Sequence, residues 1–190
     1  MLSERFGHFL DKPLMGLSLR IRLHPNTLTI TGFIVILLSA FVIPLNPFYG
    51  GILLSAGALF DMLDGIVARN RNLVSTFGAF LDSTLDRLSD ALIFLSLAIL
   101  FYLRSDIDYS LLSILSLIFS FLVSYTRARI EGLGGEGKIG IAERPERLLI
   151  LIAGLITGYI KIAIWIILIM TIITTFHRGY HAWKIFKTTG

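Results

Sequence analysis

Four aspartates, Asp61, Asp64, Asp82 and Asp86, lie in a stretch of sequence that is otherwise largely apolar. Placing one carboxylate at the centre of a bilayer costs roughly 2.5–3.5 kcal/mol, and four together cost on the order of 10 kcal/mol before their mutual repulsion is counted. Positive charge must offset this cost. Carboxylates grouped in pairs suit hard, oxygen-seeking cations such as Mg²⁺. The residue types therefore indicate a divalent-metal site.

The spacing of the aspartates explains how helices could bring them together. Asp61 and Asp64 are three residues apart, and Asp82 and Asp86 are four apart, so each pair shares one face of a helix. The short connection 69–76 makes the two helices antiparallel neighbours. Both pairs can then point into one cavity at a similar depth.

The composition sets the class of protein that must position these residues. The chain has 190 residues, is 55% hydrophobic, and contains no cysteine, which excludes disulfides and thiolate metal sites. We predict an all-α integral membrane protein with six transmembrane helices, preceded by an amphipathic juxtamembrane helix. The apolar runs place the six spans at about 27–44, 47–69, 77–103, 109–130, 145–160 and 161–178.

The first residues differ in pattern from the rest of the chain. Residues 1–24 mix apolar and basic side chains, which is typical of an amphipathic helix lying on the cytoplasmic surface. We expect no cleaved leader, because the first long apolar run starts only near residue 27. Residues 25–190 form the predicted transmembrane domain, with Asn26 or Thr27 as the N-cap of its first helix.

The distribution of positive charge predicts the topology. With the six spans above, 15 of the 17 lysines and arginines fall on one side, and only Arg104 and Lys161 fall on the other. Cytoplasmic loops are enriched in Lys and Arg. We therefore predict a multi-pass protein of the plasma membrane, with both termini and the four aspartates on the cytoplasmic side.

A second group of charged residues lies around the connection between the fourth and fifth predicted helices. Arg127, Lys138, Arg144 and Arg147 occur there, together with a glycine-rich stretch at 132–140. A basic cytoplasmic loop is expected in any such protein. However, Arg127 lies within a predicted helix, where a cation is costly without a partner, and glycine amides can wrap a phosphate. These features favour an anion pocket beside the metal centre.

The aspartates form part of a longer motif, Asp61-x-x-Asp64-Gly65-x-x-Ala68-Arg69-x8-Gly78-x3-Asp82-x3-Asp86. This motif resembles, without gaps, the signature of the CDP-alcohol phosphotransferase (phosphatidyltransferase) family. It fixes the residue at eight of 26 positions. Members of this family transfer a phosphoalcohol from a CDP-alcohol to an acceptor hydroxyl and release CMP.

The resemblance also implies the roles of individual residues. Asp61, Asp64, Asp82 and Asp86 would bind two Mg²⁺ ions (Mn²⁺ is a possible substitute), and Asp86 would also be the general base. The implied nucleotide-binding residues are Asn26, Thr27, Gly65, Arg69, Ser75 and Gly78. The family resemblance further favours a homodimer.

Two further strings resemble the branch that makes phosphatidylinositol phosphate or archaetidylinositol phosphate. These are Ser124-Tyr125-x-Arg127-Ala128-Arg129-x-Glu131-Gly132 and Ile141-Ala142-Glu143-Arg144-Pro145-Glu146-Arg147. The implied acceptor is inositol 1-phosphate and the donor is CDP-diacylglycerol or CDP-archaeol. Residues that would hold the acceptor's phosphate are Arg127, Arg144, Arg147 and Arg178.

Several alternatives remain open at this point. The acceptor could instead be glycerol 3-phosphate, serine or free inositol, and the donor could be soluble CDP-inositol, giving di-inositol phosphate. A divalent-cation transporter is a candidate of a different class, since carboxylates within membranes mark ion paths. Against a transporter, the aspartates cluster at one end of their helices, and no acidic residues continue the path outward.

Overall fold

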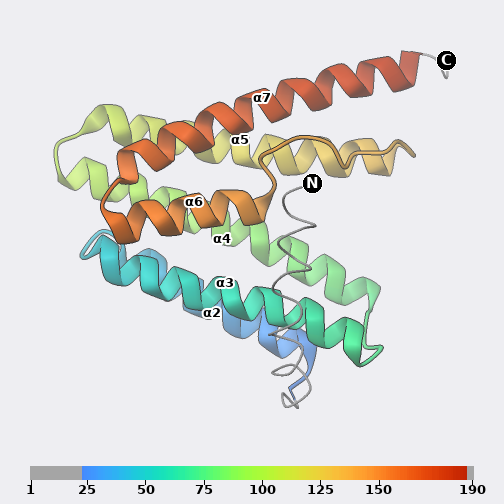
Figure 1. Cartoon of the computed structure of the whole chain (residues 1–190), viewed down its shortest axis with the longest axis horizontal. Helices are drawn as coiled ribbons and strands as arrows, with labels where there is room; N and C mark the ends of the chain where they lie inside the picture. The colour runs from blue at the N-terminus through green and yellow to red at the C-terminus, as the bar shows by residue number, and fades with distance from the viewer. Residues whose placement is uncertain (1–22, 188–190) are drawn as a thin grey trace. The chain divides into compact units, whose positions relative to one another are not determined.

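The computed structural model describes residues 23–187, and every regular element in that range is an α-helix. The helices, shown in Figure 1, are α2 (Pro25–Val42), α3 (Pro47–Asn70), α4 (Thr76–Leu103), α5 (Ile107–Gly132), α6 (Arg144–Thr157) and α7 (Ile160–Lys187). They correspond to the six predicted segments. The predicted surface helix covers residues 1–24. Residues 1–22 lie outside the described range, and residues 23 and 24 are not helical.

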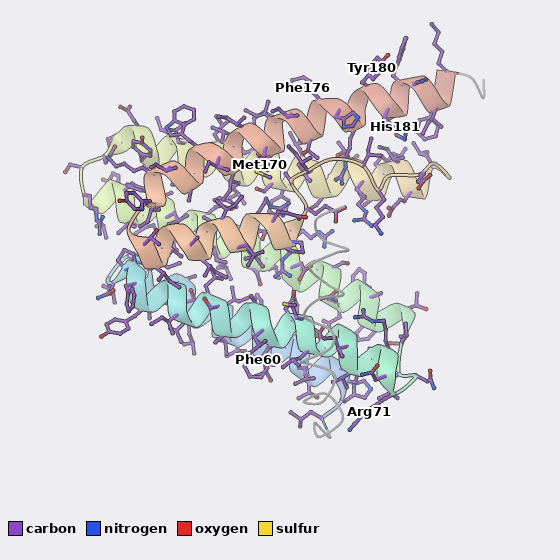
Figure 2. The ribbon with its side chains drawn as sticks, viewed as in Figure 1. Phe60, Arg71, Met170, Phe176, Tyr180 and His181 are labelled. Atoms are coloured by element: carbon purple, nitrogen blue, oxygen red, sulfur yellow. The ribbon has the colours of Figure 1, made fainter. Side chains whose placement is uncertain are left out.

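The largest difference from the predicted segments is at the end of α7, which was expected to stop near residue 178 but continues to Lys187. Its last turns carry exposed aromatic residues and two lysines, with Lys187 Nζ 4.7 Å from the centre of the Trp183 ring. Figure 2 shows Phe176 and Tyr180 on the outer side of this helix, and both are exposed. Aromatic and basic side chains of this kind are typical of the membrane–water interface.

Four of the described helices, α2, α3, α5 and α7, are long and apolar enough to cross a membrane. They indicate a multi-pass membrane protein. The helix α6 has only 14 residues. The helix α4 is long enough, but its last 18 residues, 86–103, still include three charged residues, Asp86, Arg87 and Asp90. The carboxylates that suggest a site are therefore the same residues that lower the apolar character of α4.

The chain forms two compact units, one ending at Ser96 and the other beginning at Leu97, so that α4 belongs partly to each. In the first unit α2 packs against α3. The two helices approach closely because Gly32 and Gly57 face each other: a Cβ on Gly57 would lie 3.2 Å from the Gly32 carbonyl oxygen and would collide with Ile36. Small residues of this kind allow close packing of helices in membranes.

In the second unit α7 packs against both α5 and α6. The α6 helix ends at Gly158, whose φ of 83° lies in the left-handed region that glycine adopts without strain. The chain then turns directly into α7 at Ile160. Buried apolar residues of α6 and α7, including Leu155, Ile164 and Ile167, form the core between these helices.

Candidate active site

Three of the four predicted metal ligands come together in the first unit. Asp61 and Asp64 lie on one face of α3 and Asp82 lies in the second turn of α4, and one carboxylate oxygen from each lies within 4.8 Å of the others. Asp64 is buried, whereas Asp61 and Asp82 are half-buried. The predicted convergence of α3 and α4 is thus present for these residues.

This group of carboxylates fits a divalent cation. Three negative charges this close repel one another, and a buried carboxylate is costly unless it is paired or bound to a metal. The Oδ2 atom of Asp64 is buried and makes no hydrogen bond within the described residues. Because all three ligands offer carboxylate oxygens, the site matches hard cations such as Mg²⁺ or Mn²⁺ rather than softer metals.

The fourth aspartate, Asp86, lies one turn beyond Asp82 on α4 and is not a member of this three-residue group. Its side chain is 17% exposed, and its Oδ2 atom is 3.9 Å from Arg87 Nη1. The Arg87 guanidinium also donates a hydrogen bond to the Ser83 carbonyl oxygen at 2.5 Å. Asp86 therefore lies next to the group, on the same helix as Asp82, with a cation beside it.

A cavity of about 300 Å³ opens beside the aspartates, between the starts of α2 and α4 and the end of α3. Asp64 and Asp82 line it. So do five of the six predicted nucleotide-binding residues, namely Asn26, Gly65, Arg69, Ser75 and Gly78. The sixth, Thr27, does not line the cavity and is exposed. Lining residues outside the predicted set are Pro25, Thr29, Ala68, Leu73, Val74 and Ala79.

The start of α2 differs from the prediction, and the difference places Asn26 in the cavity. The N-cap is His24, not Asn26 or Thr27: its Nδ1 atom accepts a hydrogen bond of 3.2 Å from the Asn26 backbone N–H. Pro25 follows at the first helical position, where its missing N–H costs nothing. The Asn26 side chain is therefore not used as the cap. One turn later, the Thr29 hydroxyl contacts the Asp64 carboxylate, which links α2 to the metal ligands.

The start of α4 explains why Gly78 is needed at the cavity. The Ser75 hydroxyl caps this helix by accepting a hydrogen bond of 3.0 Å from the Gly78 N–H. A Cβ on Gly78 would lie 2.9 Å from Ser75 Oγ and 3.1 Å from Asn26 Oδ1. A side chain at this position would therefore push apart the first turns of α2 and α4 and fill part of the cavity.

The predicted acceptor-binding arginines lie in the second unit, and Arg178 is the most buried of them. It is 1% exposed. Its Nε donates to the Ile139 carbonyl oxygen at 2.7 Å, and its Nη1 donates to the Val123 carbonyl oxygen. Its Nη2 is buried, makes no hydrogen bond within the described residues, and lies 3.9 Å from Glu143 Oε1. This edge of the guanidinium thus faces the Glu143 carboxylate without a hydrogen bond to it.

The Glu143 carboxylate also pairs with Arg127. Arg127 Nη1 donates to Glu143 Oε1 at 3.2 Å, and Arg127 Nε donates to Glu131 Oε1 at 2.9 Å. Arg147 is also buried and donates from Nη1 to the Ala142 carbonyl oxygen at 2.8 Å. Arg144 is half-buried at the first position of α6. Glu143, which the sequence did not single out as a site residue, lies between two of the predicted acceptor-binding arginines.

Comparison with known proteins identifies the family of the chain. The family model of CDP-alcohol phosphatidyltransferases matches residues 22–177. The chain therefore belongs to the CDP-alcohol phosphatidyltransferase family. It is an enzyme that transfers phosphate-containing groups.

The relatives place the chain more narrowly within this family. It is 44% identical to archaetidylinositol phosphate synthase of Pyrococcus horikoshii over 84% of each chain. It also matches the crystal structure of Mycobacterium tuberculosis phosphatidylinositol phosphate synthase with CDP-DAG bound, with a TM-score of 0.79, 31% identity and 94% coverage of both chains. The same enzyme in complex with manganese and citrate matches with a TM-score of 0.78 and 31% identity, over 92% of this chain and 87% of that one. The resemblance to the inositol-phosphate branch is confirmed.

Proposed function

We propose that this enzyme transfers a phosphatidyl or archaetidyl group from a CDP-linked lipid to the hydroxyl of inositol 1-phosphate and releases CMP, in a reaction that depends on Mg²⁺. The observation that carries this proposal is the convergence of Asp61, Asp64 and Asp82 beside a cavity lined by Asn26 and Arg69. The names of the relatives support the lipid donor and the inositol phosphate acceptor. The manganese complex of one relative supports a divalent metal.

In this proposal the cavity in the first unit holds the cytidine diphosphate part of the donor. Asn26 offers an amide for hydrogen bonds to the nucleotide, and Arg69 offers positive charge to its phosphates. Gly65 and Gly78 leave the room that this ligand needs. Asp61, Asp64, Asp82 and Asp86 hold two divalent cations, which would supply electrostatic stabilisation to the diphosphate and to the departing CMP.

The acceptor needs a base and an anion-binding site. Asp86 takes the proton from the attacking hydroxyl, and its half-buried carboxylate lies beside Arg87. Arg127, Arg144, Arg147 and Arg178 hold the phosphate of the acceptor. The buried Nη2 of Arg178 supports this assignment, because an anion would satisfy a donor that makes no hydrogen bond within the described residues.

The proposal extends to the arrangement in the membrane. All six helices from α2 to α7 cross the bilayer, including α4 and the short α6. The transmembrane domain comprises residues 25–190. The active site and both termini face the cytoplasm, and the protein works as a homodimer in the plasma membrane. The excess of Lys and Arg on one side of the predicted spans supports this orientation.

An acceptor panel tests the proposed reaction. The purified protein is incubated with Mg²⁺ and labelled CDP-diacylglycerol or CDP-archaeol, together with inositol 1-phosphate, glycerol 3-phosphate, serine or inositol. Mass analysis of the lipid product and measurement of CMP then identify donor and acceptor. We expect inositol 1-phosphate to give the largest kcat/KM. Preference for another acceptor, or activity only with soluble CDP-inositol, would contradict the proposal; metal uptake without CMP release would favour a transporter.

A further inference from the structure

The connection between α5 and α6, residues 133–143, is tied to α7 at three places. The Ile141 N–H donates to Thr174 Oγ1 at 3.3 Å, and the Ile139 carbonyl oxygen accepts from Arg178. Further along, His181 Nε2 is 3.2 Å from the Glu136 carbonyl oxygen. Figure 2 labels His181 and Tyr180 on different sides of α7. The connection therefore runs along α7 and ends at Glu143, the residue before α6.

Gly140 shows how close this contact is. Its φ of 112° lies in the region that favours glycine, and a Cβ there would collide with Thr174. The backbone is thus held against α7 just before Glu143. As a result, the position of the Glu143 side chain relative to Arg178 is set by fixed backbone contacts and not by the ion pair alone.

Glu143 is the N-cap of α6, yet its side chain makes no capping hydrogen bond. Instead, the carboxylate points to the arginines: Oε1 is 3.2 Å from Arg127 Nη1 and 3.9 Å from Arg178 Nη2. Its side chain is only 15% exposed, so water screens these charges weakly. One carboxylate oxygen thus lies between two guanidinium groups, an arrangement that a phosphate oxygen would also adopt.

We propose that Glu143 is a built-in counter-ion that occupies part of the anion site formed by Arg127 and Arg178 and weakens the binding of simple phosphate there. This inference rests on the proposed function, in which these arginines hold the acceptor's phosphate. A phosphate entering the site must displace the Glu143 carboxylate or bear its repulsion. The phosphate of a phosphorylated alcohol bears the same repulsion, but the hydroxyl groups of the alcohol can form further contacts that offset it. Glu143 therefore keeps free phosphate from binding tightly at this site.

The test measures the binding of inorganic phosphate to the full-length protein in detergent by isothermal titration calorimetry. Glu143→Gln keeps the size of the side chain and an acceptor oxygen but removes the charge. We expect the Kd for phosphate to fall by about tenfold, as removal of a nearby, weakly screened like charge implies. Glu143→Asp keeps the charge and should stay within about threefold of the wild type. A Kd that is unchanged or higher in Glu143→Gln would overturn the inference.

Glu131→Gln is the matched control, because Glu131 also pairs with Arg127, at 2.9 Å, but its side chain is 47% exposed. Solvent screens its charge, so we expect less than about a threefold change in phosphate affinity. An equal tightening in both variants would show a general charge effect and overturn a specific role for Glu143. If Glu143→Gln and Glu143→Ala both fail to fold, the carboxylate is a structural element, which also overturns the inference.

Kinetics separate this inference from the proposed function. In Glu143→Gln we expect phosphate to inhibit turnover with inositol 1-phosphate at about tenfold lower concentration than in the wild type. If the wild type does not use inositol 1-phosphate but phosphate still binds more tightly to Glu143→Gln, the proposed acceptor is wrong and the counter-ion role is supported. If turnover occurs but phosphate binding and inhibition do not change, only the inference about Glu143 fails.

Discussion

Lys161 Nζ lies 2.6 Å from Asp106 Oδ2 and thereby joins the first turn of α7 to the N-cap of α5. The same ammonium lies 4.4 Å from the centre of the Tyr109 ring, and the Tyr109 hydroxyl accepts a hydrogen bond of 3.3 Å from Trp165 Nε1. Lys161 is one of the two basic residues on the side predicted to face away from the cytoplasm. An ion pair and an aromatic cluster thus connect α5 and α7 at that end of the second unit.

The pair predicts a pH dependence of stability. The hydrogen bond from Lys161 holds the pKa of Asp106 below its usual value of 3.8. The stabilisation is therefore present above the pKa that Asp106 has in the unfolded chain. It is lost as the pH falls through the lower pKa that Asp106 has in the folded protein. We expect Asp106→Asn to lower the melting temperature at pH 7, and this difference to shrink below about pH 4.

Thermal unfolding of the detergent-purified protein at pH 7 and pH 3 checks this prediction, with Asp108→Asn as the control. Asp108 is exposed in the first turn of α5. A deficit of Asp106→Asn that is as large at pH 3 as at pH 7 would show that the ionised pair does not carry the effect.

The close contact between α2 and α3 predicts that Gly57→Ala is destabilising. The added Cβ would meet the Gly32 carbonyl oxygen at 3.2 Å and collide with Ile36, and overpacking of this kind costs about 1–3 kcal/mol. Gly179→Ala is the matched control within α7, since a Cβ there meets nothing within 4 Å. Alanine at that exposed position should be neutral or stabilising by up to about 1 kcal/mol. Equal unfolding midpoints for the two variants would argue against the packing.

Asp86 has a predicted role that separates turnover from binding. If it is the base, Asp86→Asn should lower kcat by about 10²–10⁴-fold, since general base catalysis contributes that much. The affinity for CDP should fall much less than kcat, because the grouped ligands Asp61, Asp64 and Asp82 remain in the variant. Turnover and CDP binding are measured on the same preparation. Near-normal turnover would remove Asp86 as the base.

The predicted role of the arginines implies that their loss changes the KM for the acceptor much more than the KM for the donor. Arg144→Ala should raise the KM for the acceptor by about 10–100-fold and leave the KM for the CDP-lipid within about threefold, since one charged hydrogen-bonding partner is lost. Arg129→Ala is the control, because Arg129 is an exposed cation in the last turn of α5. It should change neither constant by more than about twofold. Equal effects of Arg144→Ala on both substrates would contradict the assignment.

The grouping of the three aspartates could be predicted because it depends on residues close together in the sequence. The intervals between Asp61, Asp64 and Asp82 and the short connection between their helices were sufficient to bring the three side chains together. The residues that line the cavity were harder to predict from the sequence. Whether Asn26 or Thr27 faces it depends on the helical position at which α2 begins, and that position is set by His24 and Pro25.

The role of Glu143 could not be predicted, because it depends on contacts between distant parts of the chain. Its partner Arg127 is 16 residues away, and the backbone before it is held by Thr174, 33 residues from Ile141. An acidic residue before Arg144-Pro145 otherwise has the pattern of an ordinary helix N-cap. Only the packing of the connection against α7 shows that its carboxylate faces the arginines.

The most direct test of the central claim is the binding of Mn²⁺ alone to the purified protein, measured by calorimetry or by electron paramagnetic resonance. The account predicts that Asp61→Asn, Asp64→Asn and Asp82→Asn each weaken Mn²⁺ binding by at least about tenfold, because each removes one carboxylate ligand. Asp108→Asn should bind like the wild type. Wild-type affinity for Mn²⁺ in all three variants would show that these carboxylates do not jointly hold a metal.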